Sequence, residues 1–121
     1  MDVKHVLEQI RRSAREGKIQ YSNHAVDRML ERKIRSESID EVLQSTDNQV
    51  IEEQPPSTEK DRSHKNSRYL IYSPQCAIYR DIIIILALTS KEEISIITVE
   101  ETDPTKWKRS GKENPYLIRI G

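Results

Sequence analysis

A histidine and three arginines in this chain are spaced so that they fall on one side of a predicted helix. Residues 21–35 read YSNHAVDRMLERKIR, and Ser22 is a residue type that caps the start of a helix. Beyond it, spacings of three and four residues make four polar side chains neighbours on the helix surface. These are His24, Arg28, Arg32 and Arg35.

This combination of side chains suits the metal-free cleavage of RNA. The reaction needs a group that removes the proton of the ribose 2′-hydroxyl and a cation that stabilises the phosphorane. Imidazole has a pKa near physiological pH, and guanidinium holds phosphate oxygens through paired N–H donors. We therefore expect His24 to act as general acid or base, with Arg28 and Arg32 anchoring phosphate. On periodicity alone, a solvated basic face with an ordinary surface histidine explains the same pattern.

Two further candidates lie in the last long predicted strand. Thr98 and Glu100 are two residues apart, so they point to the same side of that strand. Thr98 can orient His24 or a phosphate, and Glu100 can serve as another acid or base; the alternatives are a β-branched strand residue and a solvated strand end. Other cations are expected to contact RNA, namely Arg35, Arg80, Lys106, Lys108 and Arg109.

Hydrophobic periodicity predicts the elements that position these residues. Helices are expected over about 2–16, from Ser22 to about Lys33, and from Ser36 or Ser38 onward. The second helix should pack on a sheet through its apolar arc, which contains Val26, Met29 and Leu30.

Strands are expected at about 18–21, 49–54, 68–72, 81–89 and 94–100. The strand at 81–89 is apolar throughout, which places it at the centre of the sheet. Short turns between consecutive strands favour an antiparallel meander. The predicted fold class is therefore α+β, with N-terminal helices packed on one face of a three- to five-stranded, mainly antiparallel sheet.

Composition limits the possible classes of function. The 121 residues are expected to form one domain, and their formal net charge is zero. Basic residues predominate up to residue 35 and again from residue 104, whereas residues 36–61 are strongly acidic. Such segregation permits a basic groove on a neutral molecule without requiring one.

Cysteine content and hydropathy indicate a cytoplasmic protein. Cys76 is the only cysteine, so an internal disulfide is impossible. The chain has no apolar run long enough for a membrane helix and no signal-peptide pattern at its start. Its three histidines show no metal-ligand spacing, and we expect neither a metal nor another cofactor.

Two motifs resemble a known family. The first, YSxHAxxRMxxRxI, begins at Tyr21 and is followed by SxxI and VL; the second, ITVxExDPxxW, ends at Trp107. They are similar to the opening and closing motifs of the domain of unknown function 4258. The resemblance implies a family core at 18–107, preceded by a helix at 1–17 and followed by a basic tail at 108–121.

In its order of helices and strands, that family resembles the RelE, BrnT and MqsR-like toxins of the barnase–EndoU–colicin–RelE class. The resemblance implies a metal-free endoribonuclease, a hydrolase acting on RNA, from a toxin–antitoxin module. Its partner would be a cognate antitoxin, which in some relatives is a zinc-finger protein of the YgiT type.

Two positions depart from the family pattern. Glu100 stands where the closing motif has tyrosine, and Arg80-Asp81 stands where relatives often have a histidine at the start of the strand. These departures favour an alternative, a non-catalytic RNA- or protein-binding module of the same fold. A third interpretation makes His24 and Arg28 structural, hydrogen-bonded where the helix meets the sheet.

Overall fold

Three helices and one short strand form the first part of the chain. The computed structural model describes residues 3–56, 66–89, 91–110 and 116–120. Helix α1 (Val3–Arg15) ends just before Gly17, whose φ of 72° is a left-handed conformation that glycine adopts readily. Helices α2 (Asn23–Arg32) and α3 (Ser36–Gln44) follow in close succession. None of the helices within the described ranges is long and apolar enough to cross a membrane.

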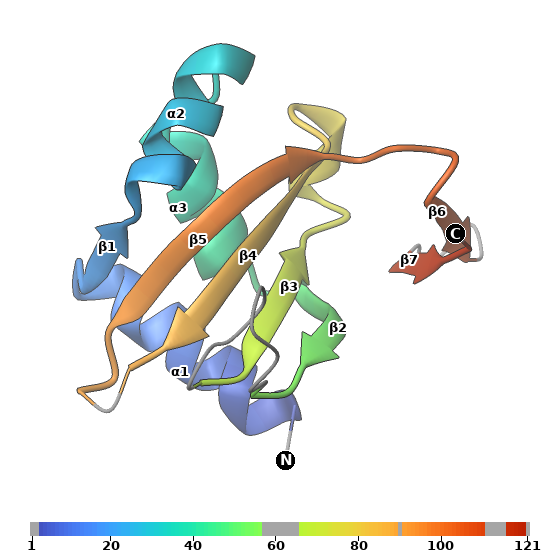
Figure 1. The fold of residues 1–121 in the computed structure, drawn as a ribbon. Coiled ribbons are helices and arrows are strands. Elements are labelled where there is room, and N and C mark those ends of the chain that lie inside the picture. Colours follow the sequence, from blue (N-terminus) through green and yellow to red (C-terminus); the bar gives the residue numbers. More distant parts are fainter. Residues whose placement is uncertain (1–2, 57–65, 90, 111–115, 121) are drawn as a thin grey trace.

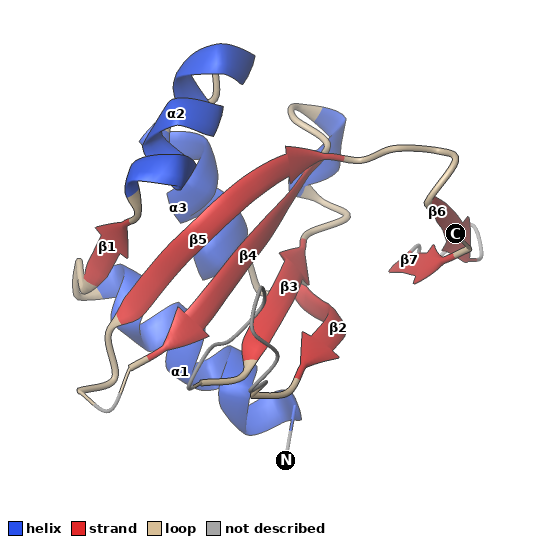
Figure 2. Cartoon of the chain, viewed as in Figure 1, coloured by secondary structure: helices blue, strands red, loops and turns tan. Residues whose placement is uncertain are grey.

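Five strands form one sheet beside these helices. They are β1 (Ile19–Tyr21), β2 (Gln49–Gln54), β3 (Arg68–Tyr72), β4 (Ile82–Leu88) and β5 (Ile94–Glu101). Their order across the sheet is β1-β5-β4-β3-β2, with β1 parallel to β5 and all other neighbours antiparallel. The α+β class and the central position of β4 are confirmed (Figures 1 and 2).

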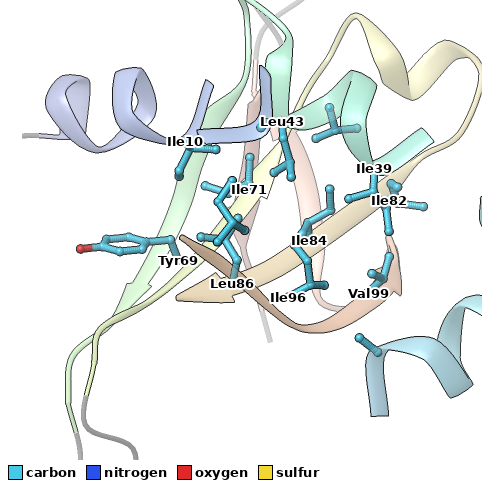
Figure 3. Packing of buried hydrophobic residues seen from close by; sticks show 14 of the residues in the cluster. Ile10, Ile39, Leu43, Tyr69, Ile71, Ile82, Ile84, Leu86, Ile96 and Val99 are labelled. Atoms are coloured by element: carbon cyan, nitrogen blue, oxygen red, sulfur yellow. The ribbon is translucent and has the colours of Figure 1, made fainter. Parts of the chain in front are cut away.

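Side chains alternate along the strands between two apolar clusters, one on each face of the sheet. The larger cluster lies between the sheet and the helices, where Ile10, Ile39 and Leu43 meet alternate residues of β3, β4 and β5 (Figure 3). The smaller cluster covers the opposite face and consists of Leu70, Tyr72, Ile83, Ile85, Trp107 and Leu117.

A C-terminal hairpin covers this second face. Its strands β6 (Trp107–Ser110) and β7 (Tyr116–Arg119) pair antiparallel in a small sheet of their own. The sequence predicted a basic tail here and no strands, because two four-residue segments are too short for alternation to be informative. Between β3 and β4, residues Cys76–Ile78 form a single 3₁₀ turn, η1.

Helix α2 packs on β5 through a narrower stripe than its periodicity predicted. Ala25 is fully buried and Met29 is half-buried, whereas Val26 is 41% exposed and Leu30 is 73% exposed. Met29 packs against the core as predicted, whereas Val26 and Leu30 are not among the residues that pack against it, contrary to the prediction. The helix lies along β5, beyond the end of the short edge strand β1, so only one side of its apolar arc meets protein (Figure 1).

The start of α3 also differs from the prediction. Arg35 is the N-cap residue, its side chain makes no capping hydrogen bond, and Ser36 already lies inside the helix. Neither Ser36 nor Ser38 is the cap.

We expect the two apolar residues Ile84 and Leu30 to respond very differently to truncation. Ile84 is fully buried in β4, so Ile84→Ala should lower the free energy of unfolding by about 2–5 kcal/mol. Leu30→Ala removes a mostly exposed side chain and should change it by less than about 0.5 kcal/mol. Urea denaturation of both variants measures the difference, and equal losses would contradict the packing of α2.

The hairpin is tied to the sheet beside a buried tyrosine. Arg109 Nη2 lies 2.5 Å from Asp81 Oδ2, and Arg119 Nε donates to Glu52 Oε1 at 2.6 Å. Burial, and next the negative charge of Asp81, raise the pKa of Tyr72 to about 12. No hydrogen bond of good geometry joins the Tyr72 hydroxyl to Asp81, so burial and charge dominate this shift.

This shift predicts a loss of stability at alkaline pH. An unfolded tyrosine loses its proton near pH 10, whereas folded Tyr72 keeps it until about pH 12. The Tyr72 contribution is therefore complete below pH 10 and is lost as the pH rises to 12, lowering the free energy of unfolding by about 2–3 kcal/mol. Urea denaturation at several pH values between about pH 9 and about pH 11 measures this loss. The free energy of unfolding should fall less steeply with pH in Tyr72→Phe than in wild type.

The free energy of unfolding of Tyr72→Phe should still fall somewhat at alkaline pH, because burial also raises the pKa of Tyr21 and of Tyr69. An unchanged slope in Tyr72→Phe would contradict the environment described for Tyr72.

Candidate functional site

Ser22 fixes the start of α2 against the sheet. Its hydroxyl accepts a hydrogen bond from the Ala25 N–H at 3.0 Å and donates to the Ile97 carbonyl at 2.8 Å. Its own N–H donates to the Ile96 carbonyl at 3.0 Å. The N-cap predicted from the sequence is confirmed. The contacts with β5 fix the position of the first turn of α2, which carries His24.

His24, Arg28 and Arg32 lie along one flank of α2. His24 is exposed, and the two arginines are half-buried. Arg28 Nη1 lies 3.5 Å from Glu31 Oε2 in the same helix, so this ion pair does not tie Arg28 to the sheet. The helix rises about 1.5 Å per residue, which places each of the three residues about 6 Å beyond the last. One phosphate group can therefore contact His24 and Arg28 together. A second phosphate group of the same strand can then lie next to Arg32.

A carboxylate gathers two arginines at the far end of this flank. Arg80 Nη2 lies 3.2 Å from Glu101 Oε1, and Arg32 Nη1 lies 3.8 Å from the same oxygen. Arg80 also donates to the backbone carbonyl of Arg32. The structure thus joins Arg80 to the predicted group, and we call the following four side chains the basic strip: His24, Arg28, Arg32 and Arg80.

Glu101 is a site residue that the sequence did not reveal. It pairs across the sheet with Ile82, which belongs to the cluster facing the helices, and so Glu101 lies on the side of the sheet where α2 packs. That assignment depends on the register of β4 and β5, which includes a bulge in β5. The strand pattern alone does not show the bulge.

Thr98 and Glu100 lie on the opposite face of the sheet. They pair with Ile85 and Ile83, which belong to the cluster beneath the hairpin. The pKa of Arg119 in the hairpin is raised, first by its hydrogen bond to a β2 carboxylate and further by the charge of Glu100. The structure therefore does not bring Thr98 or Glu100 to the basic strip, contrary to the expectation that Thr98 orients His24.

Arg35 does not continue the line of cations on α2. The helix ends at Arg32 because Lys33 adopts a left-handed conformation with φ of 55°. Arg35 is the exposed N-cap residue of α3, outside the helical arc that the spacing predicted.

The three remaining predicted cations belong to the C-terminal segment. Lys106 and Lys108 are exposed, and Arg109 is paired with Asp81. Asp81 directly follows Arg80, just before β4 begins. Arg32 of α2 therefore lies near one side of this point, and Arg109 of the hairpin lies near the other. Within the described ranges, no three or more His, Cys, Asp or Glu side chains cluster as metal ligands would.

Comparison with known proteins identifies a family. A family model described as "Domain of unknown function (DUF4258)" matches residues 21–101. The matched span includes the whole basic strip and ends at Glu101, while α1 and the hairpin lie outside it. No curated protein and no solved structure matches the chain.

Proposed function

We propose that this chain, which belongs to the DUF4258 family, binds RNA along the basic strip and cleaves it without a metal ion. In this proposal the chain has a RelE-like fold and acts as the endoribonuclease of a toxin–antitoxin module. The observation that supports this most is the shared flank of α2, where an exposed imidazole lies one helical turn from a guanidinium and two more guanidiniums follow.

In the proposed reaction, neutral His24 removes the proton of the ribose 2′-hydroxyl, and the 2′-oxygen attacks the adjacent phosphorus. The bond from phosphorus to the 5′-oxygen breaks, and that oxygen takes a proton from water. Arg28 donates to the non-bridging oxygens, where negative charge develops. Arg32 and Arg80 hold the neighbouring phosphate. The products carry a 2′,3′-cyclic phosphate and a 5′-hydroxyl.

A specific observation favours a second function, RNA binding without cleavage. Thr98 and Glu100 lie on the face of the sheet opposite α2, so neither of them stands beside His24 as a second proton-transfer group. A single exposed histidine beside arginines is sufficient for binding phosphate, whereas rapid cleavage usually benefits from a second group that protonates the leaving oxygen.

A toxin also needs a protein that keeps it inactive. We propose that a cognate antitoxin encoded beside this chain covers the basic strip by charge complementarity. Co-expression of the two genes followed by purification should then yield a stoichiometric complex. A chain that elutes alone from such an experiment would count against the toxin proposal.

The cleavage mechanism predicts large losses of activity from single substitutions in the basic strip. His24→Ala and Arg28→Ala should each slow RNA cleavage about 100-fold or more. Both residues lie on a polar helix flank, so the free energy of unfolding should change by less than about 0.5 kcal/mol. Cleavage of a single-stranded RNA in the presence of EDTA measures the rates, with end analysis of the products.

Arg12→Ala is the matched control, because Arg12 is an exposed arginine on α1 outside the basic strip. Full activity in His24→Ala, or a requirement for Mg²⁺, would refute the mechanism. RNA binding by a wild-type protein that never cleaves would establish the non-catalytic function instead.

Glu101 is expected to compete with RNA for two arginines. Its Oε1 lies 3.2 Å from Arg80 and 3.8 Å from Arg32, so an incoming phosphate must displace it. Glu101→Gln should therefore tighten RNA binding by about 3- to 10-fold. The slope of the logarithm of the binding constant against the logarithm of the salt concentration should become more negative by about 0.7. Fluorescence anisotropy at several salt concentrations measures both quantities.

Glu16→Gln provides a control with the same change in charge, at an exposed ion pair with Lys18 outside the basic strip. Weaker binding by Glu101→Gln would show that the carboxylate orients the arginines for RNA and does not compete with it.

A further inference from the structure

Two large apolar side chains project from the surface at η1. Ile78 is 76% exposed and Tyr79 is 82% exposed, more than any other large apolar residue in the described part of the chain. Single exposed apolar side chains are common on protein surfaces, but a neighbouring pair beside a groove is typical of an interaction site.

Hydrogen bonds hold the turn that carries this pair. Ser73 Oγ and Ser45 Oγ donate to Asp47 Oδ1 at 2.6 and 2.5 Å, and the Gln75 N–H donates to Asp47 Oδ2 at 2.8 Å. The Cys76 N–H donates to Ser73 Oγ at 3.3 Å. Burial opposes ionisation of Asp47, but these hydrogen bonds outweigh it and lower the pKa of the carboxyl group. A turn held in this way has little conformational entropy left to lose on binding.

An open groove of about 770 Å³ lies between this turn and α3. Asp40 and Glu41 of α3 line it on one side, and Cys76 and Tyr79 line it on the other. Burial, and then the negative charge of Glu37, raise the pKa of Asp40. Throughout the described residues, no ion pair joins Asp40 or Glu41 to a cation of this chain.

The chemistry of the groove restricts what can occupy it. Its carboxylates attract lysine and arginine side chains, and the exposed ring of Tyr79 can pack against an aliphatic stem or contact a cation. The same carboxylates repel phosphate groups, so the groove is unsuited to RNA.

We propose that the groove between α3 and η1 docks a basic, amphipathic segment of a partner protein. Apolar side chains of that segment pack on Ile78 and Tyr79, and its cations pair with Asp40 and Glu41. This surface adjoins the basic strip, because Tyr79 directly precedes Arg80 and the Arg80 N–H donates to the Cys76 carbonyl of the same turn. The proposal does not depend on the proposed action on RNA.

The test uses the full chain and two synthetic peptides. One is a short amphipathic helix of leucine and lysine, and the other carries glutamate at each lysine position. Cys76 lines the groove and is the only cysteine of the chain, so its rate of reaction with a thiol reagent reports occupancy. The lysine peptide should slow this reaction and shift the amide NMR signals of residues 40–45 and 75–79, and the glutamate peptide should do neither.

Substitutions localise the binding. Tyr79→Ser and Glu41→Lys should each weaken binding of the lysine peptide by about tenfold. Leu30→Ser and Glu8→Lys are the matched controls, since Leu30 is 73% exposed and Glu8 is an exposed acid on α1. Both controls should bind the peptide as wild type does, and thermal unfolding checks that all four variants fold.

Three results would overturn the proposal. The first is equal binding of both peptides, and the second is binding that neither Tyr79→Ser nor Glu41→Lys weakens. The third is a wild-type protein that sediments as a dimer and becomes monomeric in Tyr79→Ser, which would assign the groove to a second copy of the chain.

Discussion

The need to cover both faces of β4 determines the architecture of this protein. Residues 82–87 of this strand are all apolar and all buried, so neither face of the central sheet can be left to water. Helices α1 and α3 cover one face, and the β6–β7 hairpin covers the other through Trp107 and Leu117. Both α1 and the hairpin lie outside the span matched by the family model. Elements on either side of the matched span therefore complete the core of this protein.

Because α1 and α3 cover the sheet, α2 lies at the margin of the sheet along β5. Most of the surface of α2 is exposed for this reason. Once Ala25 is buried against β5 and Ser22 is bonded to the carbonyl groups of that strand, most of the helix remains in contact with solvent. One flank then carries His24 and the arginines, while Val26 and Leu30 are left exposed on another.

Opposite charges are separated on this neutral molecule. The basic strip follows α2 to the start of β4, where Glu101 holds two of its arginines. Helix α3, the next element, contributes Asp40 and Glu41 to an open groove between α3 and η1. A formal net charge of zero therefore conceals one surface rich in cations and another lined by carboxylates. Net charge alone shows neither surface.

Local patterns in the sequence determined the helices, the central strand, the Ser22 cap and the common flank of His24, Arg28 and Arg32, since each depends on residues a few positions apart. Tertiary structure decided which side of each element is covered. It placed Thr98 and Glu100 on the face of the sheet opposite α2, because strand register and the bulge in β5 assign each side chain to a face.

Tertiary structure also exposed Leu30, brought Arg80 to Arg32 through Glu101 and folded the basic tail into a hairpin. These features depend on contacts between residues far apart in the chain. Periodicity describes how one element divides into apolar and polar sides, but it does not specify what packs against either side.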